Sequence, residues 1–171
     1  MIQEKYVKYT IYISLFVQIV TSILSYDGTN YKLLEKDEVL KDVLNLELIV
    51  QIIESAFYIW VIFALKDLSK MTSRRYIDWA ITTPTMLIST IIFMKYQEHK
   101  EKNDGTIVTF NGFINDNKSI IIKIVVLNAL MLLFGYLGET NKMDKNQCIF
   151  IGFIFFLWSF KIIYDEYAKK S

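Results

Sequence analysis

The sequence predicts an all-α fold, a polytopic bundle of transmembrane helices, from three observations. Hydrophobic residues make up 53% of the 171 residues and aromatic residues 15%, both well above the composition of ordinary soluble proteins. The apolar residues lie in long runs separated by short charged segments, which indicates helices. One proline and six glycines leave too few turn residues for a many-stranded β-sandwich. We therefore expect a single transmembrane domain over residues 1–171.

Five segments are long and apolar enough to span a bilayer, whose hydrocarbon core of about 30 Å needs roughly 20 mostly apolar helical residues. They are Tyr6–Ser25, Leu44–Leu65, Tyr76–Tyr96, Ser119–Gly138 and Ile149–Tyr167. Continuous apolar runs such as Ile120–Leu137 lack the alternation of barrel strands, so helices are predicted rather than a barrel. The length of the first run and the spans behind it favour a retained helix over a cleaved signal peptide.

The segments between these spans carry most of the charge and are predicted to be water-facing loops. They are Asp27–Asp42, Lys66–Arg74, Gln97–Lys118 and Glu139–Asn146. Within the first loop, Asp37–Val43 alternates acidic and apolar residues and is predicted to form a short surface helix that leads into the second span. Lysine and arginine are divided almost evenly between the two sides, so their distribution does not fix the orientation.

Charge and composition exclude several classes of function. The formal net charge is +1, from 19 basic and 18 acidic side chains, so nucleic acid is not an expected partner. Cys148 is the single cysteine and excludes an intramolecular disulfide, and His99 has no second ligand at zinc spacing. The sequence has no glycine-rich phosphate loop and no nucleophile elbow, so we do not expect an enzyme.

The third predicted span carries a buried polar face. Thr82, Met86 and Ser89 follow Asp78 by four, eight and eleven residues, which places all four on one face of a helix, and Arg75 precedes Asp78 by one turn. An ionisable group at bilayer depth is costly and is therefore a functional candidate. Arg75 is predicted to hold Asp78 ionised as a counter-ion for a charged cofactor or ion. The alternative is a structural salt bridge near the membrane surface.

Pro84, the only proline, falls inside the same span. It removes a backbone donor and frees a carbonyl near Ala80, which the hydroxyls of Thr82 or Thr83 could compensate. We expect the helix to bend at this point.

Two further spans carry polar or small residues on one face. In the second span Glu47, Gln51, Glu54 and Tyr58 form a polar stripe, with Glu47 near the end of the span and Glu54 deeper. A protonated carboxyl bonded to a neighbouring helix is the structural alternative for Glu54. In the fourth span Asn128, Met131 and Gly135 share a face on which the glycine permits close approach of a helix or a flat ligand.

Two segments resemble the microbial, type 1 rhodopsins. The first is Arg75-Tyr76-Ile77-Asp78-Trp79-Ala80-Ile81-Thr82-Thr83-Pro84, which resembles the third-helix signature of that family. The second is Asn128-Ala129-Leu130-Met131-Leu132-Leu133-Phe134-Gly135-Tyr136-Leu137-Gly138-Glu139, which is similar to the fourth helix and following loop of proteorhodopsin-type and viral rhodopsins. The stretch Leu46–Glu54, with the aromatic run through Trp60, also resembles the second helix of the viral group.

The resemblance implies a role for each matching position. Asp78 would be the Schiff-base counter-ion and primary proton acceptor, and Arg75 would lie on the extracellular side of the exit path. All-trans retinal would be contacted by Trp79, Thr82, Thr83 and Met86, with Met131 and Gly135 beside its ionone ring. Ser89 stands where many outward proton pumps carry the carboxylate that reprotonates the Schiff base.

The resemblance covers five of the family's seven helices. The sixth and seventh helices, and with them the lysine that bonds retinal, have no match here, and Lys161 and Lys123 do not fit that position. We therefore expect a fragment of a seven-helix rhodopsin with its N-terminus outside and its C-terminus in the cytoplasm. The function implied is a light-driven ion transporter in the lipid bilayer, most concretely an outward proton pump, with a homo-oligomer as a further expectation.

Three alternatives remain open. A light-gated cation channel is one, because Glu54 would place a carboxylate in a pore between helices, and a photosensor is another. From a different class, a five-helix membrane scaffold without photochemistry would explain the missing lysine. The reading frame beyond Ser171 would separate the scaffold from the rhodopsins if it supplied a helix with Asp-x-x-x-Lys.

Overall fold

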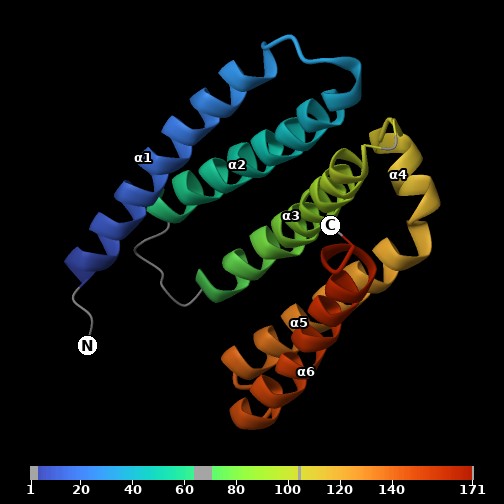
Figure 1. The fold of residues 1–171 in the computed structure, drawn as a ribbon. Coiled ribbons are helices and arrows are strands. Elements are labelled where there is room, and N and C mark those ends of the chain that lie inside the picture. Colours follow the sequence, from blue (N-terminus) through green and yellow to red (C-terminus); the bar gives the residue numbers. More distant parts are fainter. Residues whose placement is uncertain (1–3, 64–70, 104, 171) are drawn as a thin grey trace.

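The chain folds into helices of very different lengths (Figure 1). The structure, a computed structural model, describes residues 4–63, 71–103 and 105–170, and this part of the chain contains no strand. Its elements are α1 (Glu4–Thr29), the 3-10 turn η1 (Glu35–Asp37), α2 (Val39–Phe63), α3 (Met71–Lys102), α4 (Phe110–Asp116), α5 (Lys118–Glu139), α6 (Lys145–Ile163) and the π-helical turn η3 (Tyr164–Ala168). The predicted all-α class is confirmed.

Five helices in the described residues are long and apolar enough to cross a membrane: α1, α2, α3, α5 and α6. Many large apolar side chains point outward from them, for example Phe16 at 67% exposure and Phe150 at 68%. In water such surfaces would drive aggregation, whereas in a bilayer the acyl chains cover them. The five predicted spans correspond in order to these five helices.

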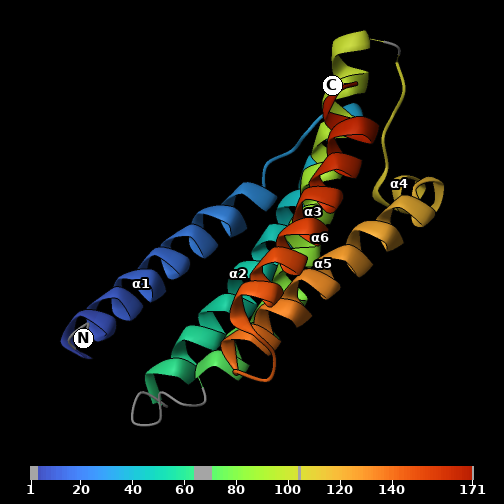
Figure 2. The same ribbon diagram turned by 90° about the horizontal axis from the view of Figure 1, so that it is seen from below.

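The helices form two antiparallel hairpins connected by α3. Helix α1 packs on α2, and α5 packs on α6, while α3 lies between the hairpins and contacts both α2 and α5 (Figures 1 and 2). This topology places the start of α3 beside the end of α5, which we call the arginine end (residues 72–76 and 136–145). The end of α3, the start of α2, α4 and η3 lie at the opposite end, which we call the core end.

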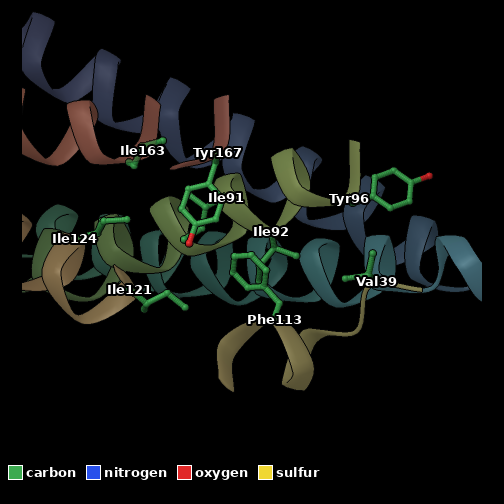
Figure 3. Close-up of a cluster of buried hydrophobic side chains, with 9 residues drawn as sticks. All are labelled: Val39, Ile91, Ile92, Tyr96, Phe113, Ile121, Ile124, Ile163 and Tyr167. Carbon is green, nitrogen blue, oxygen red and sulfur yellow. The ribbon is translucent and has the colours of Figure 1, made fainter. Parts of the chain in front are cut away.

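A cluster of buried apolar side chains gathers at the core end (Figure 3). Its members come from α2, α3, α4, α5, α6 and η3: Val39, Ile91, Ile92, Tyr96, Phe113, Ile121, Ile124, Ile163 and Tyr167. The Tyr167 hydroxyl donates to the Asn117 side chain at 2.9 Å, and its ring lies 5.9 Å from that of Phe113. The short helix α4 is thereby fastened to the C-terminal turn.

Several predicted boundaries near the core end were wrong. Helix α2 begins at Val39 rather than Leu44, so the helix predicted over Asp37–Val43 is largely the start of α2 itself, preceded by η1. The reason is that Val39, at 2% exposure, is part of the core cluster, so this turn is held by packing as well as by local pattern.

The predicted loop Gln97–Lys118 is partly helical. Helix α3 continues to Lys102, because Glu98 forms ion pairs with Lys95 at 2.9 Å and Lys102 at 2.5 Å along its last turns. The same loop also contains α4, whose first turn is capped by the Thr109 hydroxyl accepting from the Gly112 amide at 3.2 Å.

The remaining ends shift by smaller amounts. Helix α1 extends beyond Tyr6–Ser25 at both ends, and α6 begins at Lys145 because the Asp144 carboxylate accepts from the Gln147 amide at 2.9 Å. Helix α3 already begins at Met71, within the predicted loop Lys66–Arg74. The rest of that loop to residue 70, and the predicted end of the second span at Leu65, lie outside the described residues.

Candidate functional site

Arg75, at the arginine end, forms an ion pair with Glu139 at the end of α5 rather than with Asp78. Thr72 also donates to Glu139, at 3.3 Å, so two residues one turn apart at the start of α3 bind the same carboxylate. The Arg75 guanidinium lies 5.1 Å from the centre of the Trp79 ring. The predicted pairing of Arg75 with Asp78 is therefore replaced by a pairing between helices, because antiparallel α5 ends beside the start of α3.

Asp78 lies one turn deeper and is buried, with 8% of its surface exposed. Its Oδ1 atom has no hydrogen-bond partner among the described residues. Thr82, at 1% exposure, donates to the Asp78 backbone carbonyl at 3.1 Å and so does not bind this Oδ1 atom. An unpartnered buried carboxylate oxygen is costly, so it indicates a site for a proton, a cation or a cationic ligand.

The Thr-Thr-Pro sequence is arranged differently from the expectation. Helix α3 runs continuously through Pro84, and the Thr82 and Thr83 hydroxyls donate to the carbonyls of Asp78 and Trp79 rather than to that of Ala80. The Thr83 hydroxyl also accepts a hydrogen bond from the Asn128 amide on α5, at 2.8 Å. Thr83 thus serves the contact between α3 and α5, whereas the bond of Thr82 stays within α3.

An apolar cavity of about 480 Å³ opens between α3, α5 and α6. Its lining includes Thr83 and Met86 of α3, Asn128 and Met131 of α5, and Ser159 and Phe160 of α6. The Ser159 hydroxyl is buried and has no partner among the described residues. A mostly apolar cavity with a few polar groups is suited to a hydrophobic ligand that carries a polar or charged group.

Polar side chains also connect α1, α2 and α3 on the other side of Asp78. Gln18 of α1 donates to Glu54, and Gln51 donates to the Ser25 hydroxyl at 3.2 Å. Nearer the core end, the Ser89 hydroxyl of α3 donates to the Glu47 carboxylate of α2. We call these three contacts the polar seam.

The comparisons with known proteins agree with this arrangement. The family model described as bacteriorhodopsin-like protein matches residues 9–171. The chain belongs to the bacteriorhodopsin-like family. No curated protein matches the chain. Membership together with five apolar helices makes this an integral membrane protein, from a family whose members generally bind retinal and use light for transport or sensing.

The predicted site residues of this rhodopsin-like chain fall into three places. Thr83, Met86 and Met131 line the cavity together. Asp78 and Thr82 are buried beside one another on α3, whereas Trp79 turns toward Tyr76, with ring centres 5.3 Å apart. Glu54 and Ser89 lie on the polar seam. The functional roles of these residues stay predictions.

Gly135 contacts an aromatic side chain in this rhodopsin-like chain. A Cβ atom at Gly135 would lie 2.7 Å from the Tyr76 hydroxyl, so the glycine makes room for that ring. This contact is the close approach of a helix that the sequence predicted as one alternative for Gly135, and any contact with a ligand would add to it.

Sequence reasoning missed Glu139 and undervalued Glu47. Glu139 was visible as the last residue of the second rhodopsin-like segment, and antiparallel helix order places the end of the fourth span beside the start of the third. Glu47 seemed too near a helix end to matter, but α2 begins at Val39, five residues earlier than predicted, so Glu47 lies inside the helix.

Proposed function

We propose that this chain provides the first five helices of a retinal-binding, light-driven ion transporter that pumps protons outward. The observation that carries the proposal is the buried Asp78 carboxylate with its unpartnered Oδ1 atom, in a chain of this family. A group that must accept a proton should be kept from water and from permanent partners, and the buried Oδ1 atom of Asp78 supports this role.

The residues present fit retinal. The cavity is apolar, and the unpartnered Ser159 hydroxyl and the Thr83–Asn128 pair supply its polar groups. Met86 and Met131 would hold the polyene from α3 and α5, since methionine side chains adapt to irregular surfaces. When bound, retinal supplies light absorption and a light-driven change of shape. None of the described residues lining the cavity is a lysine.

The protein's own groups define a path for protons. Asp78 takes up a proton at Oδ1, and the Arg75–Glu139 pair lies at the arginine end, where the proton leaves. By analogy with the family, the arginine end is extracellular, so the start of α1 is outside and the end of α6 is cytoplasmic. Release at this end makes the transport outward.

The experiment is light-driven proton movement by the rhodopsin in which this chain is followed by a helix carrying the retinal-binding lysine. Illuminated cells should acidify an unbuffered medium, and a protonophore should abolish the change. Asp78→Asn should abolish it too, whereas Asp116→Asn, which alters an exposed carboxylate at the end of α4, should leave it intact. Alkalinisation of the medium, or full activity of Asp78→Asn, would contradict the proposal.

The polar seam favours a light-gated cation channel as the second candidate. Carboxylates and amides at Glu54, Gln51 and Glu47 follow one side of α2 and contact α1 and α3, as the lining of a hydrated pore would. Photocurrents under voltage clamp distinguish the two functions. A pump current keeps its sign across the voltage range, whereas a channel current reverses with the cation gradient.

A further inference from the structure

A second hollow, of about 440 Å³, runs between α5 and α6, and we call it the outer groove. Its apolar walls include Val126 and Leu127 of α5 and Trp158 and Ile162 of α6. None of the described residues that line it also lines the cavity of the candidate site. Val126 is 50% exposed and Trp158 55%. In a bilayer these walls need an apolar occupant, because an empty hollow would lose van der Waals contacts.

Two side chains of opposite charge, Lys123 of α5 and Glu166 of η3, line the outer groove at the core end. At 1.5 Å per residue Lys123 lies about 7.5 Å along α5 from its first residue, Lys118. The headgroup layer of a bilayer is about 5–7.5 Å thick on each side, so Lys123 lies where headgroups meet acyl chains. Trp158 precedes Glu166 by two turns and therefore lies deeper. The groove thus has charges at the level of headgroups and apolar walls at the level of acyl chains.

The two charged side chains are available to a ligand. Lys123 is exposed and has no ion pair or hydrogen bond with the described residues. A cation at the edge of the hydrocarbon layer is costly without a counter-ion, so Lys123 favours an anionic group. The Oε2 atom of Glu166 accepts from Lys170 at 3.2 Å, and that bond does not use Oε1. The pair is exposed, at 49% and 44%, and so holds Glu166 only weakly.

We propose that the outer groove binds one phospholipid whose headgroup carries both a phosphate and a primary ammonium group, as in phosphatidylethanolamine. Lys123 would bind the phosphate, Glu166 would accept hydrogen bonds from the ammonium group, and the acyl chains would pack on Trp158 and the apolar walls. The trimethylammonium group of phosphatidylcholine has no N–H to donate, and phosphatidylglycerol has no cation for Glu166. This proposal does not depend on the proposed function.

The order of groups along the outer groove favours a lipid over a second copy of this chain. From the core end inward the groove presents charges and then apolar walls, which is the order of headgroup and acyl chains in one leaflet. A helix of a second copy would cover Lys123 and Glu166 and would need an opposite charge at each place. Without those charges, burial of the two groups would be costly.

The first test measures which lipid contacts Trp158. The 171-residue chain with Trp60→Phe and Trp79→Phe, which leaves Trp158 as the only tryptophan, is placed in phosphatidylcholine vesicles. Brominated phosphatidylethanolamine or brominated phosphatidylcholine with the same acyl chains is added, since bromine quenches tryptophan fluorescence on contact. Phosphatidylethanolamine should bind about two- to fivefold more strongly, the range expected for an exposed ion pair. A chain that retains only Trp60, on α2, should show a ratio near one.

The second test separates the two charged groups. Glu166→Gln should bring the ratio of phosphatidylethanolamine to phosphatidylcholine binding at Trp158 to one. Lys123→Met should reduce the preference for brominated phosphatidylcholine over brominated diacylglycerol, which lacks a phosphate. Asp165→Asn and Lys118→Met are the controls, because they change exposed charges at the same end that do not line the groove. Both ratios should be unchanged in them.

Two results would overturn the proposal. One is a ratio of one in the chain with native Lys123 and Glu166, or a preference for phosphatidylethanolamine that survives Glu166→Gln. The other is Trp158 fluorescence that no brominated lipid quenches until the chain is diluted with more lipid, because a second copy would then occupy the groove. Neither test uses light or retinal, so failure of the proposed pump function would leave these results unaffected.

Discussion

The side-chain amide of Asn128 on α5 donates to the Thr83 hydroxyl on α3 at 2.8 Å, and that hydroxyl donates in turn to the Trp79 carbonyl at 2.6 Å. The bond joins the C-terminal hairpin to the central helix at the depth of the cavity, which both residues line or adjoin. A single hydroxyl therefore serves the backbone of one helix and the side chain of the next.

This bond should stabilise the bundle by a measurable amount. Interhelical hydrogen bonds in membranes contribute about 0.6 kcal/mol on average and up to roughly 1.7 kcal/mol. We expect a coupling free energy in this range from a double-mutant cycle of Asn128→Leu and Thr83→Val, followed by unfolding in mixed micelles. A coupling near zero would show that the two side chains do not act on each other.

Gly135→Ala should destabilise the packing of α3 on α5. The added Cβ would lie 2.7 Å from the Tyr76 hydroxyl, so the ring or the helix must shift, at a cost of about 1–3 kcal/mol. Gly152→Ala is the matched control, because its nearest neighbour is the Met131 carbonyl oxygen at 3.6 Å, an ordinary contact. Thermal unfolding in detergent should lower the transition temperature of the first variant only, and equal temperatures would contradict the contact.

Asp78→Asn should change the colour of the retinal-bound protein. A carboxylate near the positive end of the bound chromophore stabilises its ground state, so removing the charge lowers the excitation energy and shifts absorption to the red. The wild type should show the same shift as the pH falls through the pKa of Asp78. Unchanged spectrum and photocurrent in Asp78→Asn would make Asp78 a structural residue.

The proposed orientation predicts which positions an impermeant thiol reagent reaches in sealed cells. Gly28 is a poor probe, because a Cβ there would meet the Leu44 side chain at 2.8 Å, so exposed Asn30 at the end of α1 is preferable. Asn30→Cys and Lys170→Cys should be protected, and Lys142→Cys, between α5 and α6, should be labelled. Cys148 is buried and should add little background. Labelling of Asn30→Cys from outside would show that the orientation is the opposite of the proposed one.

The 171-residue chain alone should not form a stable pigment. Lys161 is exposed and paired with Asp165 at 2.9 Å, and it is not among the residues lining the cavity. Retinal added to the purified chain should keep the spectrum of free retinal. A red-shifted band that hydroxylamine bleaches would contradict this expectation, and Lys161→Ala would then test whether that lysine is the attachment point.

The sequence predicted the spans well because each depends on a property of a single segment. Length and apolar composition decide whether a helix can cross a bilayer, and five of the described helices meet those conditions. The predicted helix boundaries were wrong where contacts with residues distant in the sequence decide where a helix begins or ends. Val39 joins α2 because it is buried in the core cluster with residues of α3, α4, α5, α6 and η3. Thr109 caps the short helix α4, which lies in a segment that its charged residues made look like a loop.

For the candidate site, the sequence predicted which residues share a face of one helix, but it did not predict which residues of other helices they contact. Asp78, Thr82 and Ser89 lie on one buried face of α3, as their spacing predicts. The partner of Arg75 was predicted one turn away on the same helix, but it lies 64 residues later on α5. Residue spacing within one helix carries no information about the charged side chains of a neighbouring helix. The contacts of Glu139 and Glu47 were therefore found only in the structure.

The hairpin architecture also has a consequence for how the chain is made. Most of the packing of α1 is on α2, and most of the packing of α5 is on α6, so each pair joins neighbours in sequence. Such local pairing carries a small loop-closure cost, and each hairpin can assemble soon after it leaves the ribosome. Joining α3 to α5 requires segments synthesised at different times, so we expect the Asn128–Thr83 bond to form late in assembly. Variants at this junction should therefore slow maturation and increase degradation by quality control more than equally destabilising variants within either hairpin.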